Sequence, residues 1–186
     1  MGFRQALEPA KELIMQLNKN NLGALRGRTS LEVPAAEIME LPEKVLQFGT
    51  GVLLRALPDY FIDKANKQGM FNGRVVVVKS TESDSSAFDR QDGLYTVCVR
   101  GIDNGKTIEE NIINASVSRV LSAKNEWDKV LDCAHAPELS IIISNTTEVG
   151  IQLVEDSIIS LPPVSFPGKL LAFLYERYRA LGGTPA

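Results

Sequence analysis

Two glycines separated by one residue, Gly49 and Gly51, stand between an apolar run and a helical pattern that begins at Leu53. A glycine at the first position permits a tight turn, and one at the third lets the backbone approach a phosphate closely. Free N–H groups at the start of the helix favour the phosphate charge. Gly49-Thr50-Gly51 therefore predicts a dinucleotide-binding turn, although a Gly-x-Gly pair also occurs in ordinary turns.

The remainder of the dinucleotide fingerprint is incomplete. Leu54 stands where a third Gly or Ala would allow close packing of helix on strand. An acid that binds the ribose should follow the second strand, and Glu82 and Asp84 are the first acids there. Lys79 and Ser80, which end that strand, would instead suit a 2′-phosphate. A solvated polar loop is an equally good interpretation, so these residues leave NAD and NADP open.

A second polar group, in the sequence SNTTEVG at residues 144–150, follows another strand-like run. Polar side chains at the carboxyl end of a parallel strand face the crevice in which ligands bind. Asn145 and Thr147 could donate hydrogen bonds to a ribose or a substrate oxygen, and Glu148 could relay a proton. The alternative is a helix N-cap in which Thr146 or Thr147 satisfies backbone donors.

The chain offers no complete catalytic set. His135 is the single histidine and is expected on the surface or at a helix end. Cys98 and Cys133 are far apart and lack metal-ligand spacing, so we interpret them as reduced cysteines rather than as a metal site. Neither a Ser-His-Asp set nor a phosphate-binding Gly-x-x-x-x-Gly-Lys loop is present, which argues against hydrolase and P-loop functions.

The elements that must position these residues alternate between strand and helix. Residues 44–48 and 74–79 are interpreted as buried parallel strands. Between them a helix is expected whose apolar face spans 53–65, which closes near Gln68-Gly69 and which Pro58 kinks or breaks. The runs 94–100 and 107–117 predict a hairpin, and helices are expected from about 125 and over 170–181 around a buried strand at 139–144. The predicted fold class is α/β, with a Rossmann-like, mostly parallel sheet, helices on both faces and an inserted β-hairpin.

The predicted domain organisation is a helical extension over residues 1–40 and a dinucleotide-binding domain over 41–186. An amphipathic helix is expected in the first twenty residues, because apolar side chains recur there at helical spacing. The final helix runs into Gly182-Gly183, and in an alternating α/β sequence such a helix normally leads to another strand. We therefore expect the sequence to be part of a longer protein.

Composition narrows the possible partners. The 186 residues are 44% hydrophobic and 23% charged, with a formal net charge of −3 and no cluster of Lys and Arg. We therefore expect no nucleic-acid partner. The apolar runs are strand-sized, whereas a membrane span needs about 20 residues, so no membrane association is expected. The lack of a signal peptide and the unpaired cysteines favour the cytoplasm.

Four motifs in order carry a resemblance to a known family. They are residues 47–56 (QFGTGVLLRA), 91–96 (QDGLYT), 144–151 (SNTTEVGI) and 165–171 (SFPGKLL). The first three resemble the N-terminal domain of the mannitol dehydrogenase family of polyol-specific long-chain dehydrogenases, and the last two are most like its members that act on sugar acids. The resemblance covers the chain from about residue 45 onward. It departs at Leu53, where many relatives have Phe, and at Lys79, where an acid that selects NAD is expected.

The resemblance implies an NAD-dependent, metal-independent oxidoreductase that interconverts a secondary alcohol and a ketone on a small-molecule sugar acid or polyol. It assigns Gly49, Thr50, Gly51 and Arg55 to the cofactor, and places Asn145, Thr147 and Glu148 in the crevice between cofactor and substrate. The family's catalytic Lys, Asn and His would lie in a second, helical domain beyond residue 186. Two alternatives remain: a non-catalytic NAD(H)-sensing module, and a methyltransferase-like domain that binds adenosylmethionine.

Overall fold

A central sheet of four parallel strands organises the computed structural model, which describes residues 16–80, 86–152, 154–156 and 162–182. The strands are β1 (Glu43–Phe48), β2 (Arg74–Lys79), β5 (Val117–Ser122) and β6 (Ile141–Ser144), in the spatial order β5-β2-β1-β6. Continuous β-branched runs such as that of β2 suit a strand that is buried on both faces. The strand order changes direction at β1, which pairs with β2 on one side and β6 on the other.

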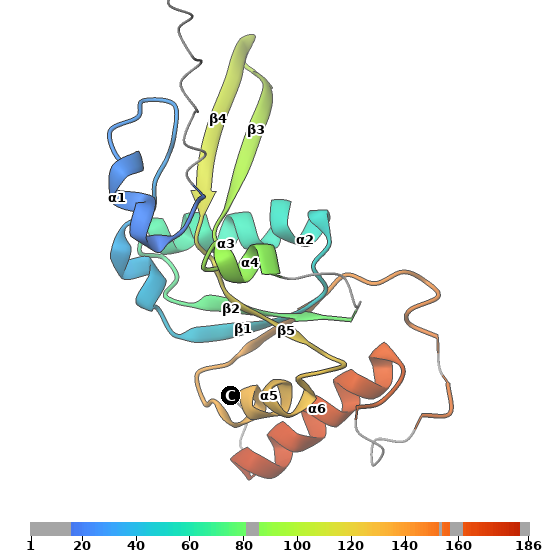
Figure 1. Cartoon of the computed structure of the whole chain (residues 1–186). Coiled ribbons are helices and arrows are strands. Elements are labelled where there is room, and N and C mark those ends of the chain that lie inside the picture. The colour runs from blue at the N-terminus through green and yellow to red at the C-terminus, as the bar shows by residue number, and fades with distance from the viewer. Residues whose placement is uncertain (1–15, 81–85, 153, 157–161, 183–186) are drawn as a thin grey trace, which may run out of the picture.

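Helices cover both faces of this sheet (Figure 1). On one side lie α2 (Val52–Ala56), α3 (Pro58–Lys67) and α4 (Ser86–Arg90), and on the other lie α5 (Trp127–Asp132) and α6 (Phe166–Leu181). The strand side chains alternate accordingly. Val75 and Val77 join a core cluster with α3 and α4 residues, whereas Val76 and Val78 pack with Trp127 and other residues of α5 and α6. The predicted Rossmann-like fold is confirmed.

The inserted hairpin is also confirmed, but its second strand is shorter than expected. Strands β3 (Tyr95–Asp103) and β4 (Lys106–Asn114) pair antiparallel through a turn in which Asn104 and Gly105 both have positive φ. We expected one strand over 107–117. Instead, Ser116 donates from its backbone N and its hydroxyl to the Asn114 side chain. This local turn redirects the chain into β5, a sheet strand that the sequence pattern did not reveal.

Several helix boundaries differ from expectation for local reasons. Pro58 is the first residue of α3, so the predicted helix over 53–65 is broken into α2 and α3. The short helix α4 was not predicted. Helix α6 begins four residues before the predicted start, because the Ser165 hydroxyl caps it by accepting from the backbone N of Gly168. It ends at Gly182, which adopts the left-handed conformation common at helix C-termini.

Two apolar segments are less buried than their patterns predict. The helical spacing places Leu53, Leu57 and Phe61 on one apolar face, which would normally be buried. Each of them is more than half exposed, whereas Leu54 is buried. Strand β6 lies at an edge of the sheet among the described strands, so its isoleucines are only partly covered. Periodicity identifies an apolar face but does not say what covers it.

The segment before β1 packs against the base of the hairpin. It contains the 3₁₀ helices η1 (Lys19–Asn21) and η2 (Ala36–Glu40) and the short helix α1 (Leu22–Leu25). Leu22 and Ile38 share a buried cluster with Leu94 and Ile113. The predicted first helix lies mostly outside the described residues, and the boundary near residue 40 stays a prediction.

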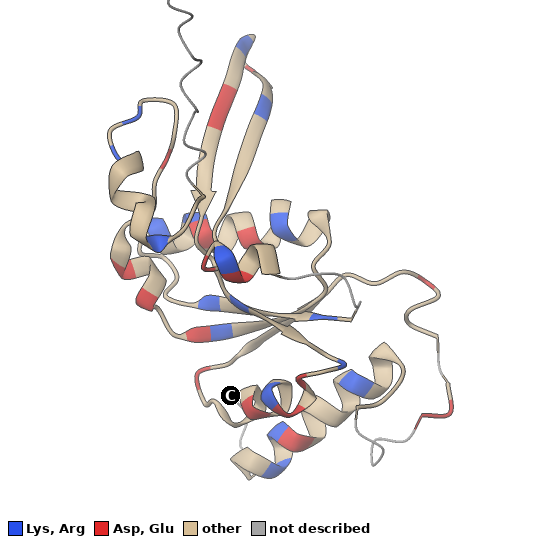
Figure 2. Cartoon of the chain, in the orientation of Figure 1, with Lys and Arg blue, Asp and Glu red and all other residues tan. Residues whose placement is uncertain are grey.

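Charges of both signs are interspersed over the described elements (Figure 2). None of the helices in the described part of the chain is both long and apolar enough to cross a membrane.

Candidate functional site

The glycine turn lies at the carboxyl end of β1, at the point where the strand order reverses. Gly49 has φ of +116°, and its N–H donates to the Val78 carbonyl at 2.9 Å, which ties the turn to the neighbouring strand β2. A side chain at this φ would be strained. The predicted need for glycine at the first position of the turn is therefore confirmed in its geometry.

The two glycines differ in what surrounds them. A Cβ added to Gly49 would lie 3.1 Å from Cδ1 of Leu54, so Leu54 occupies the space beside this residue. Gly51 has an ordinary φ of −60° and precedes α2, and a Cβ added there would meet no atom within 4 Å. The structure thus leaves open space beside the backbone of Gly51, as close approach of a ligand requires.

A crevice of about 180 Å³ opens beside the turn. It is lined by Gly49 from the end of β1, by Ser80 after β2, by Asn145 and Thr146 after β6, and by Lys169 on α6. Lys169 is half-buried, and burial lowers the pKa of its ammonium group while the nearby Asp156 carboxylate opposes this shift. Ligands of open α/β sheets bind at this edge, at the reversal of strand order.

The segment after β6 places one predicted residue beside the turn. The Asn145 carbonyl oxygen would be 3.8 Å from a Cβ at Gly49, so the two loops are adjacent. Thr147 lies in a turn, where its hydroxyl and carbonyl oxygens accept from the Gly150 N–H at 3.3 and 2.9 Å. Glu148 is exposed in the same turn. The Thr147 hydroxyl thus satisfies a backbone donor, as the alternative interpretation expected, but no helix follows directly among the described residues.

Arg55 lies against aromatic rings. Its guanidinium carbon is 5.7 Å from the centre of the Phe88 ring and 6.0 Å from that of Tyr95. The Tyr95 hydroxyl donates to the Arg55 carbonyl at 3.0 Å. This arrangement fixes α2 against α4 and β3, and a contact between Arg55 and a cofactor stays a prediction.

A buried polar pair lies directly behind the turn. Gln47 on β1 and Asp59 on α3 are both fully buried, and Nε2 of Gln47 donates to Oδ2 of Asp59 at 3.3 Å. The same Nε2 donates to the Gly49 carbonyl, also at 3.3 Å. Burial raises the pKa of Asp59 to about 7, and the Gln47 hydrogen bond, the Arg55 charge and Tyr95 limit the rise. Sequence reasoning assigned no role to either residue; the only signal was a polar residue within each of two apolar patterns.

The other residues considered from sequence are placed as follows. Lys79 is buried at the end of β2. Glu82 and Asp84 lie outside the described residues. His135 is exposed, as expected, and its Nε2 is 2.9 Å from Oε1 of Glu176. Cys98 and Cys133 are both free, in agreement with the sequence interpretation.

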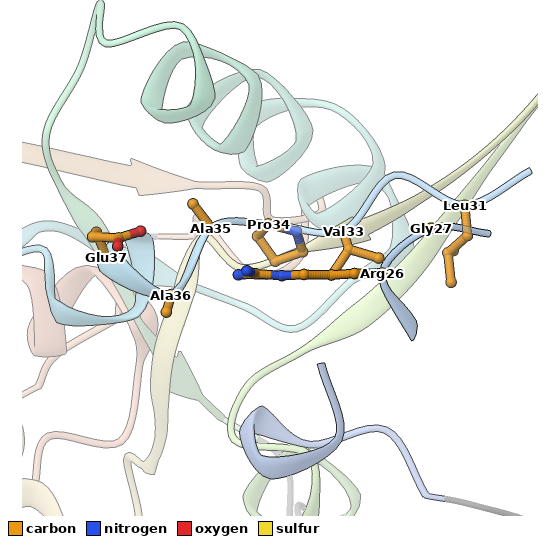
Figure 3. A pocket seen from close by; sticks show the side chains of 8 residues that line it. All are labelled: Arg26, Gly27, Leu31, Val33, Pro34, Ala35, Ala36 and Glu37. Carbon is orange, nitrogen blue, oxygen red and sulfur yellow. The ribbon is translucent and has the colours of Figure 1, made fainter. Parts of the chain in front are cut away.

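A larger cavity, of about 390 Å³, is formed by the N-terminal segment alone (Figure 3). The residues that line it lie between Arg26 and Glu37, and these two are the charged residues of the lining. It includes neither the glycine turn nor the crevice, and we assign no chemistry to it.

Curated proteins with similar sequences are altronate oxidoreductases. The altronate oxidoreductase of Halalkalibacterium halodurans is 44% identical over 146 residues, which are 77% of this chain and 28% of that protein. Those of Bacillus subtilis and Pectobacterium carotovorum are 42% and 41% identical, over 77% and 74% of this chain and 30% and 29% of their own lengths. The chain is similar to the N-terminal part of altronate oxidoreductases. It spans under a third of their length. No protein-family model matches it.

Solved structures share the fold of the chain. The complex of Pseudomonas fluorescens mannitol 2-dehydrogenase with NAD and D-mannitol has a TM-score of 0.75 at 23% identity, over 92% of this chain and 37% of that one. A D-sorbitol dehydrogenase gives 0.73 at 20% identity, over 91% and 37%. These two likenesses show the fold, and the resemblance predicted from the sequence motifs is supported by the similarity to altronate oxidoreductases.

Proposed function

We propose that this chain is the NAD-binding part of an oxidoreductase of the altronate oxidoreductase type, which interconverts D-altronate and D-tagaturonate by hydride transfer. The observation that carries the proposal is the glycine turn: positive φ at Gly49, open space at Gly51, and a place at the reversal of strand order. The similarity to altronate oxidoreductases narrows the substrate from any polyol to a sugar acid.

The residues present fit the cofactor. The backbone at Gly49, Thr50 and Gly51 would hold the pyrophosphate, and the N–H groups at the start of α2 have no side-chain cap that competes for them. Asn145 would contact the ribose or nicotinamide from the loop after β6. The Thr147 oxygen accepts from Gly150, which leaves its hydroxyl hydrogen free to donate to the ligand. Glu148 would face the substrate side of the crevice.

When bound, NAD(H) supplies the hydride acceptor or donor. The contribution of this chain is to bind and orient the dinucleotide, and the base that moves the hydroxyl proton is expected outside these 186 residues. We therefore expect the chain to bind NADH without turning over either sugar acid. The expected cytoplasmic location and absence of a nucleic-acid partner stay predictions.

The substitution G51A tests the proposal. Its methyl group would enter the open space that a dinucleotide must occupy, while the φ of −60° suits alanine. We expect NADH affinity to fall by at least about tenfold, or 1.4 kcal/mol, with stability unchanged or slightly higher. The matched control is G101A, on the exposed hairpin strand β3, where a Cβ also meets nothing within 4 Å.

Isothermal titration with NADH measures both variants and the wild type. Unchanged binding in G51A would remove the turn as the site. No binding to the wild type at millimolar NADH would refute the proposed function itself. Turnover of altronate by the 186-residue chain would refute the expectation that its catalytic base lies elsewhere.

A further inference from the structure

Besides the backbone bond from Gly49 to Val78, one side-chain amide group, that of Gln47, holds the glycine turn. Nε2 of Gln47 carries two hydrogens, and its two acceptors at 3.3 Å are the carbonyl oxygen of Gly49 and Oδ2 of Asp59. Gln47 and Asp59 are both 0% exposed, so no solvent competes for these bonds. The orientation of the Gln47 amide therefore links Asp59 to the backbone of the turn.

The same two side chains carry two of the four buried side-chain atoms that lack a hydrogen-bond partner in the described part of the chain. They are Oε1 of Gln47 and Oδ1 of Asp59, and both are acceptors when the carboxyl group is ionised. A proton on Oδ1 would turn that atom into a donor toward the amide oxygen. The acid and the amide would then form a cyclic pair with two hydrogen bonds, and each atom without a partner would gain one.

We propose that Asp59 is a positioning residue of the dinucleotide site, which in its protonated form fixes the Gln47 amide and, through it, the Gly49 carbonyl of the turn. The proposal rests on the proposed binding of NAD(H) at this turn. In the ionised form, Oδ2 of Asp59 would still accept from Nε2 of Gln47, but Oδ1 and the amide oxygen would both stay without a partner, so one bond instead of two would fix the amide. The Gln47 amide would then hold the Gly49 carbonyl less firmly.

The other groups packed around Asp59 favour its ionised form, and burial opposes them. The Tyr95 hydroxyl on β3 donates to the Arg55 carbonyl and also interacts with the Asp59 carboxyl group, which lowers the pKa of Asp59. Asn114 on β4 donates to the backbone carbonyl of Asp59. Arg55 on α2 lies near Asp59 and favours the carboxylate; its guanidinium is stacked against two rings, and its Nε is buried without a hydrogen-bond partner in the described part of the chain. Asp63, one turn along α3, is paired with Lys67 at 2.6 Å. Burial outweighs these influences and raises the pKa of Asp59 to about 7.

A pH dependence of cofactor affinity follows. Below pH 7 the carboxyl group is protonated, the acid–amide pair is closed and the turn is preformed. If only this form binds, the apparent affinity scales with its population, which falls about tenfold between pH 6 and pH 8. We therefore expect the Kd for NADH to rise about tenfold over that range.

The test is a fluorescence titration with NADH at pH 6 and pH 8. In D59N an amide N–H replaces the acid O–H and does not titrate, so affinity should stay near the pH 6 wild-type value at both pH values. Q47M removes the link and should bind weakly at both. D128N, on the exposed surface of α5, is the control and should keep the wild-type tenfold change. An unchanged pH dependence in D59N would overturn the proposal.

A ligand-free measurement separates the two proposals. Carbon-13 NMR of the Asp59 carboxyl group and nitrogen-15 shifts of Gly49 and Thr50 should titrate with one midpoint near pH 7 in the wild type. In D59N the two amide shifts should not titrate. If they titrate together but NADH binds at no pH, the proposed function fails and only the coupling between Asp59 and the backbone of the turn stands. If Asp59 titrates near its ordinary pKa, or the turn does not follow it, the positioning role is wrong.

Discussion

Replacing Asp59 by Asn should change the pH dependence of stability by a predictable amount. Burial raises the pKa of Asp59 from 3.8 to about 7, so the folded state binds a proton more tightly than the unfolded state. Stability is therefore highest below the unfolded-state pKa and falls as pH rises through the folded-state pKa. Between pH 5 and pH 8 this one group should remove about 3 kcal/mol of the free energy of unfolding.

The amide of D59N has the shape of the protonated acid and no charge to bury. The free energy of unfolding of D59N, measured relative to that of the wild type, should therefore rise by about 3 kcal/mol between pH 5 and pH 8. For a chain of this size that corresponds to a relative rise in Tm of about 6–12 °C. Equilibrium unfolding in urea, followed by circular dichroism at both pH values, measures the difference. Because other titrating groups are common to both proteins, an identical difference at pH 5 and pH 8 would refute the reasoning.

Two further substitutions test the local geometry. G49A should lower the free energy of unfolding by about 1–3 kcal/mol, because φ is +116° and the added methyl group would lie 3.1 Å from Cδ1 of Leu54. Urea unfolding measures this change, and an unchanged free energy would show that the turn relaxes without strain. R177A should lower the free energy of unfolding by about 2–3 kcal/mol, because the guanidinium donates to three backbone carbonyls after α5, and R177K should lie between R177A and the wild type. Equal stability of R177A, R177K and the wild type in thermal unfolding would contradict this. The three carbonyls belong to Ala134, Ala136 and Leu139.

Features encoded by neighbouring residues were predictable from the sequence. The strands over 44–48 and 74–79 appear as continuous apolar runs, and glycine at residue 49 signals a backbone conformation that other residues rarely adopt. The position of the turn at the carboxyl end of a parallel strand then follows from chain order alone. The candidate site was found because its main feature is a property of backbone rather than of distant contacts.

Features that depend on long-range packing were not predictable. Strand β5 follows the hairpin after only two residues, so the runs on either side of Ala115 and Ser116 read as one strand. The exposed side chains of Leu53, Leu57 and Phe61 have the spacing of a buried face. Burial is a property of what lies opposite, and no local pattern carries that information.

The contact between Gln47 and Asp59 depends both on local sequence and on long-range packing. Gln47 and Asp59 are twelve residues apart, on a strand and on the helix that crosses over it, and only the βαβ arrangement brings them together. A polar residue in an apolar strand and an acid after a proline are each unremarkable in sequence, yet their contact buries an ionisable group beside the glycine turn. Since burial of an unpaired acceptor is costly, Asp59 stays protonated up to a pH of about 7. The same contact therefore links the stability of the fold and the shape of the turn to a single proton.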